Sequence, residues 1–300
     1  MSAQRASRRF GPRALSLTVG LAVATAVLPA APASAAVPGL VRISATSASN
    51  STDFRSVTAT CPAGKVLTGA GYEINGATGE AVVDDFRPNG GAATAPTAVT
   101  VGAYEAEAFA GNWSVTAYAI CANPVAGLVR VSATSASNST DFRSVTATCP
   151  VGKVLTGTGY ELTGVTGEGV VDDFRPNGGT VTAPTSVTVG AYEAEAFAGN
   201  WSATAYAICA NPLAGLVRNS AVGASNSTDF HSVTATCPAG KVLTGAGYEL
   251  NGVTGEAVVD DFRPGGGPAA APASVFSGAY EEDAFAGNWT NTAYAICATA

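Results

Sequence analysis

Apolar and polar residues alternate along most of the chain, which is the pattern of β-strands with one buried face. Residues 56–61 read Ser-Val-Thr-Ala-Thr-Cys, so Val57, Ala59 and Cys61 share one face and the hydroxyl side chains share the other. Residues 97–104 alternate in the same way. These segments predict strands that pack one face against a core.

Turn-forming residues separate the other predicted strands. The strand expected at 66–74 contains two glycines, which indicate a bulge or a close approach of another backbone. A strand at 81–87 ends at the Pro-Asn-Gly-Gly turn of residues 88–91, and the last strand covers 112–122. Only residues 103–110 have helical propensity, and eight residues are too few for a stable helix.

This series of strands and turns occurs three times with a period of 88 residues, at 39–126, 127–214 and 215–300. Short strands separated by turns predict an all-β fold of three tandem antiparallel sandwich or barrel units. A threefold sequence favours repeated binding or repeated structure over one catalytic centre.

The first 35 residues have the features of a secretory signal peptide. Four arginines precede an apolar stretch at 14–30, and Ala33-Ser34-Ala35 is a small-residue cleavage site. No second apolar run of membrane-spanning length follows. We therefore expect a secreted, extracellular protein that begins near Ala36.

Removal of the signal peptide makes the chain strongly acidic. It takes away four of the 15 Lys and Arg residues and none of the 22 Asp and Glu residues, which leaves 11 against 22 and a formal net charge of −11. Such a surface repels phosphate backbones and anionic lipids, so we expect neither nucleic acid nor membrane as a partner.

The six cysteines of an exported chain predict disulfides. If the cysteines pair within each repeat, the same two positions are joined three times. If they pair between neighbouring repeats, Cys61 and Cys297 have no partner. Zinc is disfavoured because the mature chain has one histidine and no Cys-x-x-Cys spacing. The favoured pairs are Cys61 with Cys121, Cys149 with Cys209, and Cys237 with Cys297.

The segments CPAGKVLTGAGYE, from Cys61, and NWSVTAYAICA, from Asn112, resemble a tandem β-repeat module of secreted actinobacterial proteins. This resemblance spans the whole mature chain. It implies export, an all-β fold and a disulfide within each unit, without implying an activity. Over about thirty residues per repeat, the order of Cys61, Asp84-Asp85 and Asn89 is also similar to the family of vitelline membrane outer layer protein I. This second resemblance implies the alternative fold, a single pseudo-three-fold β-prism built from all three repeats.

An acidic set recurs in each repeat and is a candidate cation site. In the first repeat it comprises Glu80, Asp84, Asp85, Glu105 and Glu107. Hard cations bind several oxygens, so a Ca²⁺ site is chemically possible, although no known calcium-loop spacing supports it and no other cofactor is expected. The favoured interpretation is a solvated acidic face, with Arg87 pairing to Asp84 or Asp85 across a turn.

Tryptophan next to an amide and an aspartate is the candidate glycan site. Trp113 follows Gly-Asn at the start of the last strand, where an exposed ring could stack on a sugar. The alternative is a core tryptophan beside the disulfide, since Trp113 and Cys121 share a strand face. The candidate binding residues are Trp113, Asp84, Asp85, Asn112, Trp201, Asp172, Asp173, Asn200, Trp289, Asp260, Asp261 and Asn288.

The third repeat has diverged most and bears on this choice. Asn291 stands where the first repeat has Val115, and a packed interior disfavours an unpaired asparagine, which favours the exposed site. His231 replaces Arg55 and is expected at the surface. The two adjacent aspartates point to opposite faces of their strand, so they do not form the two walls of a glycosidase cleft.

From the sequence we therefore expect a non-catalytic protein secreted by a Gram-positive bacterium. The leading hypothesis is multivalent, lectin-like binding to an extracellular glycan, an envelope polymer or a protein surface. A structural component of an extracellular particle or cell surface is the second hypothesis. A secreted inhibitor or toxin-associated subunit is the third.

Overall fold

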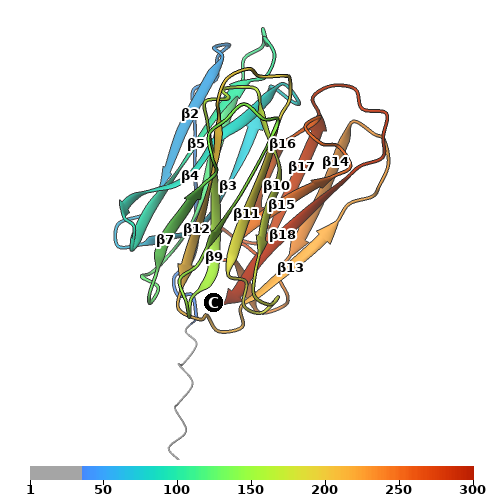
Figure 1. Ribbon diagram of the computed structural model, residues 1–300. Helices are drawn as coiled ribbons and strands as arrows, with labels where there is room; N and C mark the ends of the chain where they lie inside the picture. The colour runs from blue at the N-terminus through green and yellow to red at the C-terminus, as the bar shows by residue number, and fades with distance from the viewer. Residues whose placement is uncertain (1–35) are drawn as a thin grey trace, which may run out of the picture. The chain divides into compact units, whose positions relative to one another are not determined.

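A computed structural model describes residues 36–300, which contain eighteen β-strands and no helix (Figure 1). The predicted signal peptide, residues 1–35, lies outside the described range. Within that range no helix is long and apolar enough to cross a bilayer. The predicted all-β fold is thereby confirmed.

Each repeat contributes six strands. The first repeat forms β1 (Val41–Thr46), β2 (Phe54–Thr60), β3 (Val66–Asn75), β4 (Ala81–Ala92), β5 (Ala95–Glu105) and β6 (Ser114–Ala122). The second forms β7 (Val129–Thr134), β8 (Phe142–Thr148), β9 (Val154–Thr163), β10 (Gly169–Asn177), β11 (Ser186–Glu193) and β12 (Ser202–Ala210). The third forms β13 (Val217–Val222), β14 (Phe230–Thr236), β15 (Lys241–Asn251), β16 (Ala257–Gly265), β17 (Ser274–Glu281) and β18 (Thr290–Thr299).

The strands form three six-stranded antiparallel sheets, and each sheet combines strands of two repeats. Sheet I has the order β2-β5-β4-β9-β12-β7 and joins the first repeat to the second. Sheet II, β13-β18-β15-β10-β11-β8, joins the second to the third. Sheet III, β1-β6-β3-β16-β17-β14, joins the third back to the first.

Each repeat is a sandwich whose two halves belong to different sheets. In the first repeat β2, β4 and β5 lie in sheet I, whereas β1, β3 and β6 lie in sheet III. The disulfide from Cys61, just after β2, to Cys121 in β6 joins the two layers, with 5.7 Å between the Cα atoms. Equivalent bridges join Cys149 to Cys209 and Cys237 to Cys297. The predicted pairing within each antiparallel unit is confirmed.

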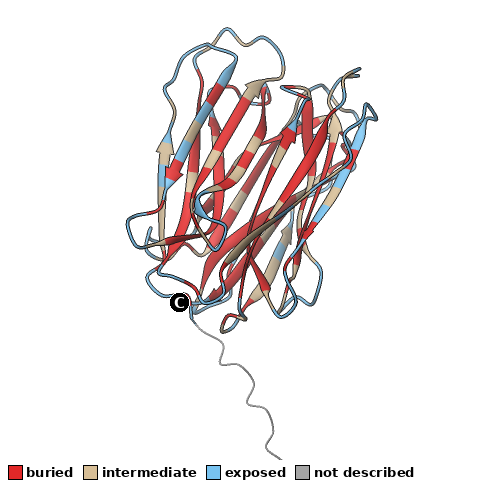
Figure 2. Ribbon diagram, turned by 60° about the vertical axis from the view of Figure 1, so that its left-hand side comes forward, coloured by how far each residue is buried: buried red, intermediate tan, exposed pale blue. Residues whose placement is uncertain are grey.

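The sheets continue from one sandwich into the next, so the three units form one closed body. At the junction in sheet I, Asp85 pairs with Glu161 and Phe86 with Tyr160. The same two pairings occur between β10 and β15 and between β16 and β3. The sequence left open whether the repeats form separate domains or a single pseudo-three-fold body. This strand order shows a single body, because each sheet contains strands of two repeats. Buried residues accordingly run along most strands, and exposed residues concentrate in loops and outer strands (Figure 2).

Backbones of three strands meet closely where the repeats converge. A Cβ atom added to Gly157 would lie 2.0 Å from the Thr68 carbonyl oxygen, and one added to Gly69 would lie 2.1 Å from that of Thr244. Gly245 contacts the second repeat in the same way. Glycine is therefore required here because no side chain fits between the strands.

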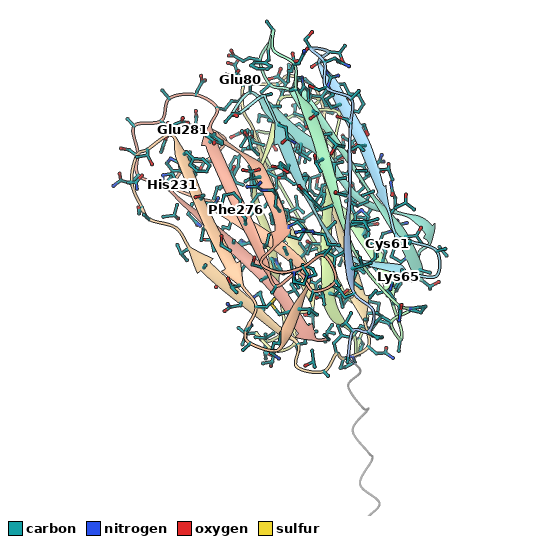
Figure 3. All side chains as sticks on the ribbon, turned by 180° about the vertical axis from the view of Figure 1, so that it is seen from behind. Cys61, Lys65, Glu80, His231, Phe276 and Glu281 are labelled. Carbon is teal, nitrogen blue, oxygen red and sulfur yellow. A yellow bond between two sulfur atoms is a disulfide. The ribbon has the colours of Figure 1, made fainter. Side chains whose placement is uncertain are left out.

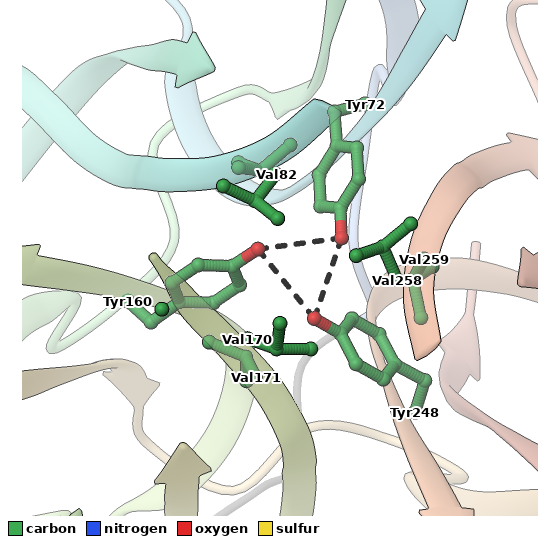
Figure 4. Close-up of a pocket in the computed structure, with 10 residues that line it drawn as sticks. Tyr72, Val82, Tyr160, Val170, Val171, Tyr248, Val258 and Val259 are labelled. Atoms are coloured by element: carbon green, nitrogen blue, oxygen red, sulfur yellow. Dashed lines mark hydrogen bonds between the residues drawn. The ribbon is translucent and has the colours of Figure 1, made fainter. Parts of the chain in front are cut away.

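Three tyrosine hydroxyls meet in the interior beside this contact (Figure 4). Tyr72 lies 3.3 Å from Tyr248, Tyr160 lies 3.3 Å from Tyr72, and Tyr248 lies 3.5 Å from Tyr160, measured between hydroxyl oxygens. A cavity of about 10 Å³, the size of one water, adjoins them. Phe86, Phe174 and Phe262 pack edge-on against one another next to this triad.

The two ends of the described chain also meet. The Val37 amide donates to the Thr299 carbonyl at 2.9 Å. Pro38 takes the place that Ala126 has in the linker after the first repeat, because the Asn123 amide donates to the Pro38 carbonyl and the Asn211 amide donates to the Ala126 carbonyl, both at 3.0 Å. The first described residues thus occupy the position of a third linker and complete the ring.

Candidate functional site

The tryptophans are in the core and do not form an exposed platform. Trp113, Trp201 and Trp289 each have 0% exposure. The Trp113 indole nitrogen donates to Glu105 at 2.8 Å, and the Arg55 guanidinium lies 5.0 Å from the ring centroid. Only Asn112 of this motif is exposed. The proposed stacking of a sugar on these rings is therefore corrected, because no ring face is open to solvent.

His231 is also buried, contrary to the surface position expected for it. Its ring centroid lies 3.8 Å from that of Trp289, and the residue is 4% exposed (Figure 3). The first two repeats have buried Arg55 and Arg143 in this position, each over a tryptophan ring. The residue at this position is buried in all three repeats because it covers the indole.

The first aspartate of each Asp-Asp pair is buried between repeats. Asp84 lies at a β-bulge of β4, and its Oδ2 accepts a hydrogen bond from the Gly167 amide of the second repeat at 3.2 Å. Burial raises the pKa of Asp84 well above its usual value. Burial likewise raises the pKa of its counterpart Asp172 to about 8. Asp260, the third counterpart, accepts from Gly79 at 2.9 Å.

Asp84, Asp85 and Glu105 each have a partner of their own, so the acidic set does not converge on one cation site. Asp85 pairs with Arg87 at 3.4 Å, which is one of the two pairings considered from the sequence. Glu105 accepts a hydrogen bond from the Trp113 indole nitrogen, and Asp84 accepts one from the Gly167 amide of the next repeat. Within residues 36–300 no three His, Cys, Asp or Glu side chains are grouped closely enough to hold a metal ion.

A hollow of about 160 Å³, formed by all three repeats, collects several of the acidic side chains. It is lined by Ala106, Glu107, Glu168, Ala194, Glu195, Glu256, Glu282 and Asp283. Burial, followed by repulsion from Asp283, Glu168 and its other acidic neighbours, raises the pKa of Glu282 to about 7. The carboxylates destabilise one another here when they are ionised.

A second polar cluster occurs on the outer face of each sheet, where two repeats join. We call it the junction site. In sheet I it comprises Asp85, Arg87, Arg130, Glu161 and Tyr206. In sheet II it comprises Asp173, Arg175, Arg218, Glu249 and Tyr294. In sheet III it comprises Asp261, Arg263, Arg42, Glu73 and Tyr118.

Each junction site is a preorganised network with residues from both repeats. In sheet I, Arg87 bridges Asp85 and Glu161 at 3.4 and 3.0 Å. The Tyr206 hydroxyl donates to the second oxygen of Glu161 at 2.6 Å, and Arg130 donates to the Pro88 carbonyl at 2.5 Å. Both carboxylates and both guanidiniums are thus held in place before any ligand arrives.

The tyrosine of each site remains protonated. Burial, together with the hydrogen bond to Glu161, raises the pKa of Tyr206 above its usual range. The counterparts Tyr118 and Tyr294 are raised for the same reasons. Each site therefore holds two guanidiniums, two carboxylates and a neutral phenol, with no net charge.

An aromatic pair flanks each junction site on the same outer face. Phe54 is 40% exposed, and its ring centroid lies 4.4 Å from that of Tyr104. A Cβ atom on Gly102 would lie 3.0 Å from the Asp85 Cβ and 3.4 Å from the Phe54 ring, so Gly102 lies between the aspartate and the aromatic pair. Phe142 with Tyr192 and Phe230 with Tyr280 repeat the pair.

The outer face at two junctions is hollowed into a groove. The groove on sheet III has a volume of about 420 Å³ and includes Arg42, Tyr118 and Arg263. The groove on sheet II measures about 260 Å³ and includes Arg218 and Tyr294. Grooves of this size accommodate one or two sugar-sized groups.

Arginine usage was the sequence signal for this site. Of the eight arginines in residues 36–300, Arg55 and Arg143 are buried and the other six all belong to junction sites. These arginines therefore fall into two kinds of position, one that covers the tryptophan ring in the first two repeats and one at the junction sites of all three sheets. Their convergence could not be read from the sequence, because the two arginines of each site come from different repeats.

No known family model matches the chain, and no curated protein is significantly similar to it. Function must therefore be inferred from the repeated sites themselves.

Proposed function

We propose that this protein is a secreted, non-catalytic, multivalent binding protein that holds an uncharged extracellular glycan at its three junction sites. One observation carries the proposal: all five residue types of the site recur at all three junctions. The third repeat keeps Arg218, Glu249, Arg263 and Tyr294 although it has replaced core residues such as Val115. A binding role explains why these surface residues are kept in the third repeat while residues of its core have changed.

The chemistry of the sites favours a neutral, hydroxyl-rich ligand. The formal net charge of −11 for the mature chain repels polyanions, and the sites themselves carry no net charge that would offset this repulsion. Arginine and carboxylate side chains that are fixed by each other can donate to and accept from sugar hydroxyls without losing further rotamer freedom. The exposed Phe54 and Tyr104 pair adds an apolar surface beside them.

The closed fold supports multivalent action. Three sites on one rigid body, tied by continuous sheets and three disulfides, bind a polymer with a high effective concentration for the second and third contacts. The disulfides are also consistent with the oxidising environment outside the cell. Weak individual sites then suffice for firm retention.

The arrangement of the carboxylates supports the absence of catalysis. Asp84 is buried against the next repeat, whereas Asp85 lies on the outer face with Arg87, so the two do not share a cleft. A structural role in an extracellular particle remains the second candidate. The burial of all three tryptophans favours it, since it removes the platform that the binding hypothesis first relied on.

Retention on insoluble polysaccharides tests the proposal. Mature protein is incubated with cellulose, chitin, curdlan, xylan and peptidoglycan, with and without calcium, and the bound fraction is measured. We expect retention on at least one of these polymers that does not need calcium. A triple Arg42→Gln, Arg130→Gln and Arg218→Gln variant should lose it.

The matched control removes three cations elsewhere. Lys65→Gln, Lys153→Gln and Lys241→Gln change the residues that bond the carbonyls of Gly39, Gly127 and Gly215, away from the junction sites. This variant should bind as the wild type does. Absence of retention on every polymer, or equal loss in both triple variants, would contradict glycan binding through the junction sites.

A further inference from the structure

The junction region of sheet III differs from the other two at one strand position. In sheet I the hydroxyls of Thr58 and Thr100 lie 2.7 Å apart, and the Asn89 amide donates to Thr100 at 2.6 Å. Sheet II repeats this with Thr146, Thr188 and Asn177, at 2.7 Å for both contacts. Two sheets thus present a closed polar ladder beside the site.

Sheet III has an aromatic ring in place of this ladder. Phe276 occupies the position of Thr100 and Thr188, and Gly265 occupies that of the asparagines. Phe276 pairs across the strands with Thr234, whose hydroxyl therefore has no threonine opposite it. The ring is partly exposed on the back of the molecule in Figure 3.

The Phe276 ring is held in a fixed position by the junction site. The Arg263 guanidinium lies 4.9 Å from the ring centroid, and Arg263 itself is fixed by Glu73 at 2.9 Å and Asp261 at 3.4 Å. A Cβ atom on Gly278 would lie 3.0 Å from the ring edge, so the ring extends along the strand over this glycine. The aromatic face is thereby positioned at low entropic cost.

The substitution also opens the groove. The side chains of Arg42, Tyr118, Thr234, Arg263, Ser274 and Phe276 line a volume of about 420 Å³ on sheet III. On sheet II the corresponding groove, with Asn177 present, is about 260 Å³. An asparagine that fills part of the groove is absent from sheet III, and an aromatic wall is present.

We propose that the sheet III groove is a specialised subsite that stacks one pyranose ring of a neutral glycan on Phe276. The other two sites lack this ring and bind the same polymer through their polar network and the flanking aromatic pair. The inference rests on the proposed function and deepens it. The apolar C–H face of a pyranose packs on an aromatic ring, while Arg42, Tyr118 and the free Thr234 hydroxyl bond its equatorial hydroxyls.

The three sites are consequently unequal in affinity. An aromatic contact of this kind strengthens binding about tenfold over a site without it. Phe276 is the residue that determines this difference, and threonine at the same position defines the weaker class.

Calorimetric titration with cellohexaose, N-acetylchitohexaose and laminarihexaose tests the inference on the mature full-length chain. The wild type should bind at least one of them with one tighter and two weaker sites. Phe276→Thr, which installs the residue of the other two sites, should weaken the tight site about tenfold and leave three similar sites. Phe276→Tyr should keep the tight site.

A reverse variant and a control complete the experiment. Thr188→Phe combined with Asn177→Gly should create a second tight site on sheet II. Val151→Thr, an equivalent change at a fully exposed position in a turn, should alter nothing. Three equal sites in the wild type, or tight binding that survives Phe276→Thr, would overturn the specialised subsite and leave the proposed function standing. Absence of binding to all three hexasaccharides would overturn both.

Discussion

Ser277 and Asn291 hydrogen-bond to each other inside the third repeat, with 3.1 Å between the Ser277 hydroxyl and the Asn291 side-chain oxygen. The Asn291 amide also donates to the carbonyls of Ser277 and His231, at 3.1 and 3.3 Å. Both residues have 0% exposure, and the first repeat has Val101 and Val115 in their places. Two polar substitutions have therefore arisen as a mutually satisfied pair.

This pairing predicts non-additive effects on stability. Ser277→Val alone leaves the buried Asn291 amide with a partner missing and should lower the free energy of unfolding by about 1 to 3 kcal/mol. Asn291→Val alone should be destabilising in the same sense. The double variant restores the valine pair of the first repeat and should be more stable than either single variant. Urea unfolding of the four proteins measures the coupling, and strictly additive effects would contradict it.

Buried carboxyl groups predict a stability that falls as pH rises. The pKa of Asp172 is raised by burial to about 8, whereas an aspartate in an unfolded chain has a pKa near 4. The folded state therefore holds a proton that the unfolded state releases between these values. Stability contributed by this group is fully present below about pH 4 and is lost as pH rises through 8, by at most about 1.4 kcal/mol per pH unit.

Asp172→Asn tests this dependence because asparagine can still accept from the Gly255 amide but cannot ionise. At pH 9 the variant should be more stable than the wild type, and at pH 5 it should have no such advantage. Ser51→Ala, at an exposed and uncharged position of the first repeat, serves as the control. The prediction fails if the free energies of unfolding of wild type and Asp172→Asn run parallel from pH 5 to pH 9.

The shared sheets predict that one repeat cannot remain a monomer. An isolated segment of residues 124–211 would expose the junction edges of β9 and β10, which carry Tyr160 and Phe174. In the intact chain these edges are paired with neighbouring repeats. Three copies of the segment should therefore close into a trimer that reproduces the sheets, as native mass spectrometry would reveal. A stable folded monomer with its disulfide formed would contradict the continuous sheets.

Local features of the fold could be predicted from the sequence because they depend on neighbouring residues. The alternation in 56–61 and the equal spacing of the cysteines were enough for the strands and for the pairing of Cys61 with Cys121. The helical propensity of 103–110 was rightly set aside. The junction between Phe86 and Tyr160 could not be predicted, since near-identical repeats give no preference between pairing within a repeat and pairing across repeats.

The candidate site was harder to predict from the sequence than the strands were, because its side chains meet through contacts between distant strands. Trp113 shares a strand face with Cys121, which predicts a buried ring, whereas Asn291 in the place of Val115, considered alone, argues against burial. The Ser277 side chain that hydrogen-bonds to Asn291 lies on another strand, and nothing in the sequence indicates that these two residues meet. The other repeats have no histidine at the position of His231, which predicts a surface residue, whereas its ring in fact replaces a guanidinium over the indole.

The most direct test of the account counts functional sites on the whole protein. The polymer that retains the wild type is titrated with variants in which one, two or three of Arg42, Arg130 and Arg218 are changed to glutamine. Each protein is first shown to unfold at the wild-type temperature. We predict that apparent affinity falls in successive multiplicative steps as sites are lost, because each intact site adds avidity to the others. Affinity that is unchanged after all three substitutions would contradict binding at the sheet junctions.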